Sequence, residues 1–285
     1  MMEAQDVVLR LLHKNITAEI IVKVKSGPKG YGLLLKLRLL LYAMLIEIFS
    51  TRKLLNHLKK RPFILDNLGF QTLPNKRTID RWKKAMDYEL QQAITLAGDR
   101  YLQLSESEWT IIDSTPLVDE NDSEATMGYN SQGQFVGFKL HMSCDEKEVP
   151  LRACVTQAHV HDSQKAKEIL APTEKAGGDC GYDSKELKEY AKKQGTRLIT
   201  SHNPRRQGRQ AKKPTPKILK AVRYHIEQCN GFVKSEVMRH LWTLVKGLKA
   251  KTVFALSAVL AIQALAIFNL TTWGYPSIRI QEVRI

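Results

Sequence analysis

The spacing of apolar residues changes once along this chain of 285 residues, near Ser105. Before that point, apolar residues between 33 and 48 recur every three or four positions, as a packed helix requires. After it, an apolar run at 109–112 and alternating patterns at 134–142 and 151–155 predict three strands. Strands that come first in a run and then alternate with helices are typical of a mixed sheet covered by helices. The fold class is therefore predicted to be α/β, with an all-α N-terminal domain.

The same pattern divides the chain into three parts. We expect a helical N-terminal domain at residues 1–104, a mixed α/β domain at 105–272 and a short tail at 273–285. Within the second domain, polar residues at 161–163 and at Ser184 are predicted to begin helices, and residues 196–200 are predicted to form a further strand. Residues 218–249 have continuous helical spacing.

Basic residues outnumber acidic ones by a wide margin. Lys and Arg total 44 against 29 for Asp and Glu, which gives a formal net charge of +15. Residues 202–220 hold seven basic residues, no acidic residue and three prolines, which predicts a basic loop that contacts phosphates. Such a charge requires a polyanionic partner. Nucleic acid, an anionic membrane surface and acidic substrates all satisfy it.

Short helices with tight turns between residues 50 and 96 suggest a helix-turn-helix geometry. Polar residues at 50–51 and at Thr78 are predicted to cap helices at 52–58 and 79–96, with a turn at 73–75 before the second. Ten basic residues and two acidic residues lie between residues 51 and 84. A surface that binds duplex DNA and a solvated basic surface on a helical bundle both fit this pattern.

The four cysteines form no C-x-x-C pair and lie far apart, so neither a disulfide framework nor a zinc knuckle is predicted. The first twelve residues include Glu3 and Asp6 and have no long apolar stretch after a basic start, which argues against a secretory signal. These features favour a reducing cytoplasm. The uncharged segment 252–270 is nearly long enough to span a membrane. Its polar residues and five alanines favour a buried core helix instead.

Carboxylates at the ends of strands are the candidates for chemistry. A pair of Mg²⁺ ions held by carboxylates can place positive charge at a phosphorus that is being attacked. Asp113 ends the apolar run 109–112, shortly before Pro116, which is predicted to halt the strand. Asp179 follows two glycines, whereas Asp183 precedes Ser184 and is a natural helix cap. Asp179 is therefore the better metal candidate. Taken alone, Asp113 could equally be an ordinary turn or cap residue.

A third acidic candidate lies on a predicted helix. Arg223, Glu227 and Lys234 are four and seven residues apart, so they project from roughly one helix face. The alternative is a plain surface ladder of ion pairs, which contributes little stability. The pair His159 and His161 could suggest a zinc site, but no cysteine or third histidine accompanies it. His161 and Asp162 are better interpreted as a helix cap or as support for the acidic residues.

Five motifs follow one another from Ser105 to about residue 270. They are Trp109-Thr-Ile-Ile-Asp113-Ser-Thr-Pro116, Gly137-Phe-Lys139-Leu-His141, Thr156-Gln-Ala-His-Val-His161-Asp162-Ser163, Asp179-Cys-Gly-Tyr182-Asp183-Ser184 and Arg223-x3-Glu227-x6-Lys234. In this order and spacing they resemble the DDE transposases of bacterial and archaeal insertion sequences. The segments Ser50-Thr51-Arg52 and Pro74-x3-Thr78-x2-Arg81 are similar to the amino-terminal domain of that family. The chain differs at Lys220, where the family usually has a tyrosine, and in residues 174–178, which are less apolar than usual.

The resemblance implies a ribonuclease-H-like core in which Asp113, Asp179 and Glu227 hold two Mg²⁺ or Mn²⁺ ions. It implies metal-dependent cleavage and strand transfer of double-stranded DNA at the terminal repeats of an element, by a homodimer or higher oligomer. The residues expected to bind DNA are Arg223, Lys234, Arg205, Arg206, Arg209, Lys212, Lys213, Arg77 and Arg81. Two alternatives stay open: a catalytically decayed transposase that only binds DNA, and a basic protein anchored in a membrane by residues 252–270.

Overall fold

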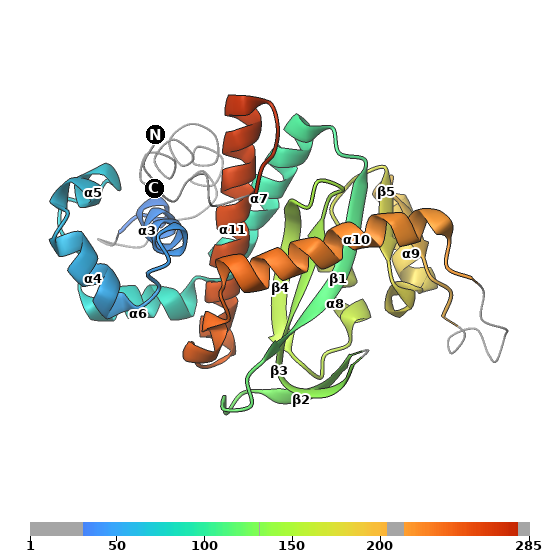
Figure 1. Cartoon of the computed structure of the whole chain (residues 1–285), viewed down its shortest axis with the longest axis horizontal. Coiled ribbons are helices and arrows are strands. Elements are labelled where there is room, and N and C mark those ends of the chain that lie inside the picture. Colours follow the sequence, from blue (N-terminus) through green and yellow to red (C-terminus); the bar gives the residue numbers. More distant parts are fainter. Residues whose placement is uncertain (1–30, 131, 204–213, 279–285) are drawn as a thin grey trace.

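The computed structural model describes residues 31–130, 132–203 and 214–278, and it has a six-stranded mixed sheet beside a group of helices (Figure 1). The helices that precede the sheet are α3 (Leu33–Leu45), α4 (Thr51–Lys59), α5 (Pro62–Asn67), α6 (Lys76–Ala85) and α7 (Asp87–Ser105). The change from helices to strands falls at Ser105, as the hydrophobic spacing predicts. The predicted α/β class and the all-α N-terminal part are thus confirmed.

The central strand of the sheet is β1 (Trp109–Val118), which pairs with antiparallel β3 (Gly133–Cys144) on one edge and with parallel β5 (Lys175–Gly178) on the other. β6 (Arg197–Thr200) lies parallel to β5, and β4 (Pro150–Gln157) lies antiparallel to β3. β2 (Thr126–Asn130) forms a hairpin with the first part of β3. The strand order β4-β3-β1-β5-β6, with the last two strands parallel to β1, is that of a ribonuclease-H-like sheet.

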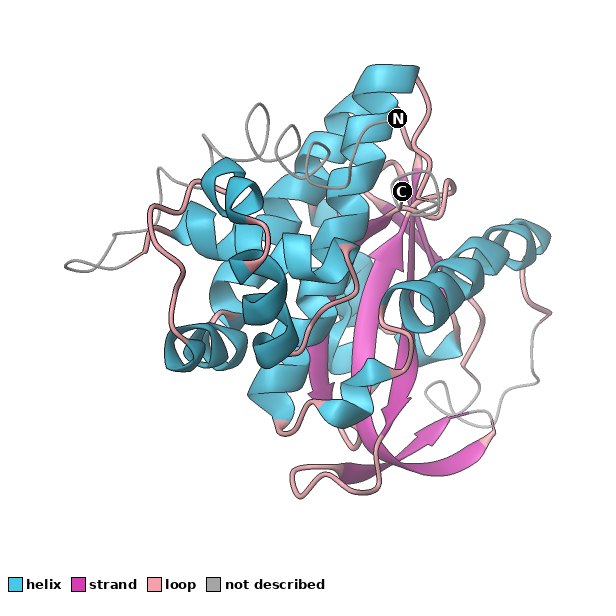
Figure 2. Ribbon diagram, turned by 60° about the vertical axis from the view of Figure 1, so that its left-hand side comes forward, coloured by secondary structure: helices cyan, strands magenta, loops and turns pink. Residues whose placement is uncertain are grey.

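Helices cover both faces of this sheet (Figures 1 and 2). α10 (Lys217–Phe232), α7 and α11 (Leu248–Trp273) pack on the face that carries Ile111 and Leu140. α8 (Asp162–Ile169) and α9 (Lys185–Lys193) pack on the opposite face, against Ile112 and Ala176. Short helical turns at Cys180–Tyr182, Val233–Val237 and Leu241–Leu244 complete the described elements. Because side chains alternate along β1, Asp113 and Thr115 share the face of Ile111 and α10.

The uncharged segment predicted to be a buried helix lies inside α11. Among the described residues this is the one helix long and apolar enough to cross a membrane, and 94% of its most apolar window is buried within the protein. It packs against α3, α6, α7 and β4, so a single hydrophobic core runs from the helical group into the sheet. The polar residue Gln263 is accommodated because its amide donates to the carbonyls of Ile94 and Leu151, both at 3.1 Å.

Some predicted boundaries were wrong. Pro116 does not end β1, which continues to Val118, because β5 pairs only with the first part of β1 and leaves that edge without a partner strand. The helix predicted at 79–96 is two helices, α6 and α7, that meet at Met86. Asn75, not Thr78, caps α6, by accepting a hydrogen bond from the Thr78 amide at 2.9 Å.

The helix predicted at 218–249 and the strands around it also differ from expectation. α10 ends at Phe232 and is followed by a π-helical turn and a 3₁₀ turn before α11 begins, so the continuous spacing crosses several elements. Residues 217–220, predicted to belong to the basic loop at 202–220, form the first turn of α10, which begins at Lys217. The hairpin strand β2 was not predicted. The predicted starts of α8 and α9 are confirmed, with His161 and Ser184 as their caps.

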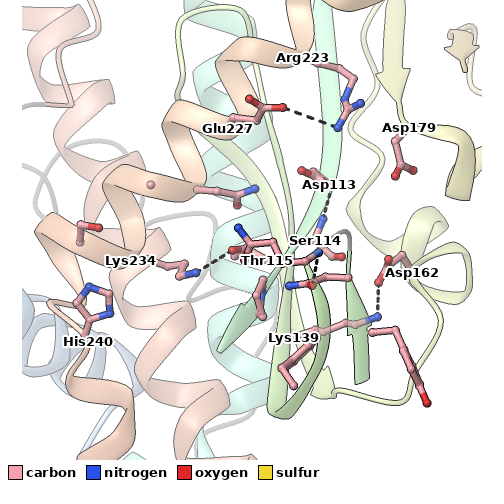
Figure 3. Close-up of a pocket in the computed structure, with 18 residues that line it drawn as sticks. Asp113, Ser114, Thr115, Lys139, Asp162, Asp179, Arg223, Glu227, Lys234 and His240 are labelled. Atoms are coloured by element: carbon pink, nitrogen blue, oxygen red, sulfur yellow. Dashed lines mark hydrogen bonds and ion pairs between the residues drawn. The ribbon is translucent and has the colours of Figure 1, made fainter. Parts of the chain in front are cut away.

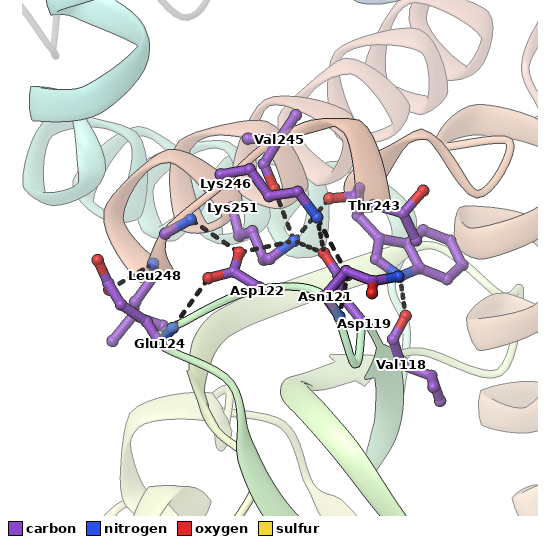
Figure 4. A network of polar contacts seen from close by, with 12 residues as sticks. Val118, Asp119, Asn121, Asp122, Glu124, Thr243, Val245, Lys246, Leu248 and Lys251 are labelled. Atoms are coloured by element: carbon purple, nitrogen blue, oxygen red, sulfur yellow. Dashed lines mark hydrogen bonds and ion pairs between the residues drawn. The ribbon is translucent and has the colours of Figure 1, made fainter.

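Buried charges join the connection after β1 to the start of α11 (Figure 4). The ammonium group of Lys251 is fully buried and lies 2.7 Å from Asp119 and 3.3 Å from Asp122. It also donates to the carbonyls of Trp242 and Val245, at 2.7 and 2.6 Å. Burial works against the charged form of Asp119, but hydrogen bonds from Lys251 and Lys246 outweigh it and hold its pKa below the usual value. This network fixes the chain between α10 and α11.

Candidate active site

A cavity of about 680 Å³ opens between β1, the β2–β3 hairpin, the start of α8 and the α10 face (Figure 3). Its walls include all three predicted carboxylates and both cations of the third motif. These residues are Asp113, Asp179, Glu227, Arg223 and Lys234. The motifs are up to 121 residues apart in sequence, and the fold brings them to one place.

Asp113 lies on the central strand, partly buried, with its Oδ1 accepting a hydrogen bond from the Ser114 amide at 2.8 Å. Burial raises the pKa of the Asp113 carboxyl to about 7, and the negative charge of Asp179 adds to that rise, while the Ser114 amide and the cation of Arg223 oppose it. The Ser114 amide and Arg223 therefore do not offset the effects that disfavour the negative charge of Asp113. A bound cation would add positive charge and favour the charged form of this carboxyl.

Asp179 directly follows β5, whose low hydrophobicity has a packing reason. A side chain at Gly177 would approach Leu219 of α10 to 3.1 Å, and one at Gly178 would approach Tyr182 to 3.0 Å. Glycine therefore allows α10 and Tyr182 to pack close to the strand. Pairing with β1 and β6 on both edges compensates for the missing apolar side chains. Asp179 itself accepts a hydrogen bond from the Gly181 amide at 2.8 Å.

The rival candidate Asp183 has a different environment. It accepts hydrogen bonds from Lys188 (2.5 Å), Thr200 (3.1 Å) and the Asn203 amide (2.9 Å), and it does not line the cavity. Burial disfavours its charged form, but these hydrogen bonds prevail and lower its pKa. Asp183 therefore connects β6 and α9 but does not cap α9 as predicted, because Ser184 is the N-cap, whereas Asp179 lines the cavity.

α10 presents its polar face to the cavity. Arg223 lies 3.8 Å from Glu227, whose side chain is 61% exposed, so this carboxylate is free to turn toward Asp113. Lys234, in the π-helical turn after α10, donates to the Thr115 hydroxyl at 3.1 Å. Burial lowers the pKa of Lys234. The Thr115 contact connects the end of this motif to the strand that carries Asp113.

These donors fit a hard divalent cation, which prefers carboxylate oxygens. Asp179 is close enough to Asp113 that its negative charge adds to the rise in the pKa of Asp113, and Glu227 also lines the cavity. As the side chains are oriented, no three acidic, histidine or cysteine residues within the described ranges stand close enough to hold an ion. Rotation of Glu227 away from Arg223 would be required to complete such a group.

Two of the other predicted DNA-binding residues are described, and they lie away from the cavity. Arg77 and Arg81 are exposed on α6 and do not line the cavity. The loop residues Arg205, Arg206, Arg209, Lys212 and Lys213 lie outside the described residues. Of the two histidines, His161 caps α8 and His159 contacts the Thr126 hydroxyl at 3.1 Å.

Three further residues of the cavity were not assigned this place from the sequence. Asp162 is the first residue of α8, and its carboxylate accepts a hydrogen bond from the buried Lys139 at 2.9 Å (Figure 3). Asn230 lies on the wall between Glu227 and Lys234. The signal for Asn230 was available, because positions 223, 227, 230 and 234 follow the four-three-four spacing of one helix face. Nothing in the spacing indicates that Lys139 and Asp162 meet, because they lie on separate elements.

The strand order of the sheet, together with the carboxylates in the cavity beside its central strand, defines a domain of the ribonuclease-H-like class. A family model described as the transposase DDE domain matches residues 105–263, more than half of the chain. The chain belongs to this family of DDE transposases. Comparisons with curated proteins and with solved structures gave no match.

Proposed function

We propose that this transposase cleaves DNA at the ends of an element and joins those ends to target DNA, with Asp113, Asp179 and Glu227 as its catalytic residues. The observation that carries the proposal is that these three carboxylates line one cavity together with Arg223 and Lys234. DDE transposases act on DNA and typically use divalent metal ions. Bacterial or archaeal insertion sequences are the proposed source of the element.

The reaction consists of two displacements at phosphorus. Water cleaves a phosphodiester at the element's end and leaves a free 3′-hydroxyl. This hydroxyl then attacks a target phosphodiester, forms a new oxygen–phosphorus bond and releases the target's own 3′-oxygen, without a covalent enzyme intermediate. Two bound Mg²⁺ or Mn²⁺ ions would activate the attacking oxygen and stabilise the leaving one.

The residues of the chain bind and orient the DNA for these steps. The carboxylates of Asp113, Asp179 and Glu227 hold the cations on one side of the cavity. Arg223 and Lys234 contact the DNA backbone beside them, because cations that contact phosphates fix the position of the DNA without reading its sequence. Recognition of the terminal repeats falls to the proposed N-terminal domain at residues 1–104, where Arg77 and Arg81 are exposed on α6.

The proposal places the protein in the cytoplasm, soluble and bound to DNA as a homodimer or higher oligomer, since two element ends must be handled together. Proteins of this family are typically soluble and cytoplasmic. The burial of α11 within the core supports the absence of a membrane anchor. The proposed domain limits stay at 1–104, 105–272 and 273–285, with a core that is continuous across the first limit.

The proposal is tested by metal-dependent nicking of a plasmid that carries the gene with its native flanking DNA. We expect cuts at defined flanking positions with Mg²⁺ or Mn²⁺, and a loss of about 10³-fold or more with Glu227→Gln, because ions at phosphorus contribute several kcal/mol and about 1.4 kcal/mol equals one factor of ten. Glu236→Gln is the control, since this exposed residue does not line the cavity. Specific DNA binding without cleavage in the wild type would favour a decayed transposase that only binds DNA.

Lys234→Gln should weaken DNA binding at low salt without changing sequence preference. The lost phosphate contact should reduce the slope of log affinity against log salt concentration by about 1. Fluorescence anisotropy of labelled duplex DNA across a salt series measures this slope. Lys249→Gln, which removes a charge outside the cavity, serves as the comparison. An unchanged slope for Lys234→Gln would contradict the assigned phosphate contact.

A further inference from the structure

Asn230 carries a polar atom that the fold leaves without a partner. The residue is 7% exposed, and its Oδ1 has no hydrogen bond within the described part of the chain. Burying an amide oxygen without a partner costs free energy. The neighbouring residues Ile226, Cys229 and Val233 are fully buried and apolar, so an apolar side chain would suit position 230 better if its role were packing alone.

The position of Asn230 indicates a role for its unpartnered oxygen. It lines the cavity on the same helix face as Glu227, one turn earlier, and Lys234, one turn later. The Oε1 of the buried Gln263 is likewise without a partner in the described part of the chain, but the nitrogen of that amide donates to two main-chain carbonyls and Gln263 lies outside this cavity. A buried polar atom that has no protein partner and belongs to a residue of the candidate active site is explained if it binds a ligand there.

The chemistry of the unpartnered Oδ1 restricts the kinds of ligand that Asn230 can bind. An amide Oδ1 accepts hydrogen bonds or binds cations, so it does not suit the oxygens of a DNA phosphate, which are acceptors themselves. Amide oxygens are established ligands for hard divalent cations alongside carboxylates. We infer that Asn230 supplies a neutral oxygen ligand, directly or through a water molecule, to a divalent cation held by Asp113 and Glu227. This inference rests on the proposed function.

A neutral ligand also suits the charge of the cavity. Asp113, Asp179, Asp162 and Glu227 already place four carboxylates around it. Their like charges repel one another when no cation is bound. A fifth carboxylate at position 230 would increase this repulsion in the metal-free protein, whereas the asparagine oxygen completes the ligand set without added charge.

Thermal unfolding of the full chain without DNA tests the inference, with Mn²⁺ or Ca²⁺ titrated as the probe. A cation that binds only the folded state raises the unfolding midpoint, and the concentration for half of the rise reports its affinity. For Asn230→Leu we expect this concentration to increase about 10-fold, as for other lost contacts around bound metals. Its metal-free midpoint should be unchanged or higher, because a buried unpartnered amide is replaced by an apolar group.

Three companion variants keep the test decisive. Asn230→Ser, whose shorter side chain cannot reach as far, should weaken the cation response like Asn230→Leu, and it replaces that variant if leucine does not fold. Asn230→Asp should lower the metal-free midpoint and strengthen the cation response. Gln228→Leu makes the same amide-to-leucine change at an exposed position of α10 outside the cavity, and it should leave both quantities unchanged.

The outcomes separate this inference from the proposed function. If Asn230→Leu and Asn230→Ser both needed the wild-type cation concentration for half of the rise in the unfolding midpoint, the assignment of Asn230 as a ligand would be overturned. This holds even if those variants bound DNA less well. Under the proposed function, Asp113→Asn loses most of the cation response. If Asp113→Asn responded like the wild type, or if the wild type did not respond, the proposed metal site itself would be contradicted, together with the role of Asn230.

Discussion

Asp113→Asn should abolish DNA cleavage and, at the same time, stabilise the metal-free protein above pH 7. Burial raises the pKa of this carboxyl to about 7, against about 3.9 in an unfolded chain. Between these two values the folded state binds more protons than the unfolded state, so stability falls as the pH rises from about 4 to about 7. The asparagine side chain stays neutral and avoids that loss.

The expected gain is on the order of 2 kcal/mol at pH 8, below the full value of the pKa difference because the carboxyl is partly exposed at the cavity wall. Urea unfolding at pH 5 and pH 8 in the presence of a chelator measures it. Cleavage of the flanked plasmid should fall by about 10³-fold or more, while DNA affinity is retained. Asp66→Asn, at an exposed position on α5, should change neither quantity. Equal stability of wild type and Asp113→Asn at pH 8 would contradict the electrostatic argument.

Lys251→Met should be among the most destabilising single substitutions in the chain. The ammonium group is fully buried and makes contacts with Asp119, Asp122 and two main-chain carbonyls (Figure 4). Its removal leaves two buried carboxylates with less compensation, and breaking a buried ion pair on one side costs about 3–5 kcal/mol. The free energy of unfolding from urea titrations measures the loss.

Two further variants isolate the cause. Lys246→Met removes the other lysine that contacts Asp119, and because that lysine is 50% exposed we expect a loss of about 1 kcal/mol or less. In the double variant Asp119→Asn/Lys251→Met, part of the stability should return, because one of the two carboxylates that have lost Lys251 is neutralised. A loss below about 1 kcal/mol for Lys251→Met would show that the network contributes little.

Much of the fold could be predicted from the sequence, because the hydrophobic period is a local property. The change of period at Ser105 separates the helices from the sheet, and alternation in 134–142 and 151–155 locates β3 and β4 within a few residues. The buried character of α11 also follows from its diluted apolar composition. Failures occurred where pairing or packing decides the boundary, as at Pro116, which pairs with Lys139 of β3 but has no partner strand on its other edge because β5 is short.

For the cavity, the sequence by itself determined the residue types and their spacing: a carboxylate after an apolar strand, another after two glycines, and a polar face on one helix. Asp179 was preferred to Asp183 because Asp183 was predicted to cap a helix, but Ser184 is the cap, and contacts with Lys188 and Thr200 hold Asp183 away from the cavity. Only the tertiary structure decided which groups meet. Lys139 reaches Asp162 from a different element, and the oxygen of Asn230 is left unpartnered by packing that no local pattern encodes. Contacts between distant segments depend on how β1, α8 and α10 pack together, and one sequence alone does not specify that geometry.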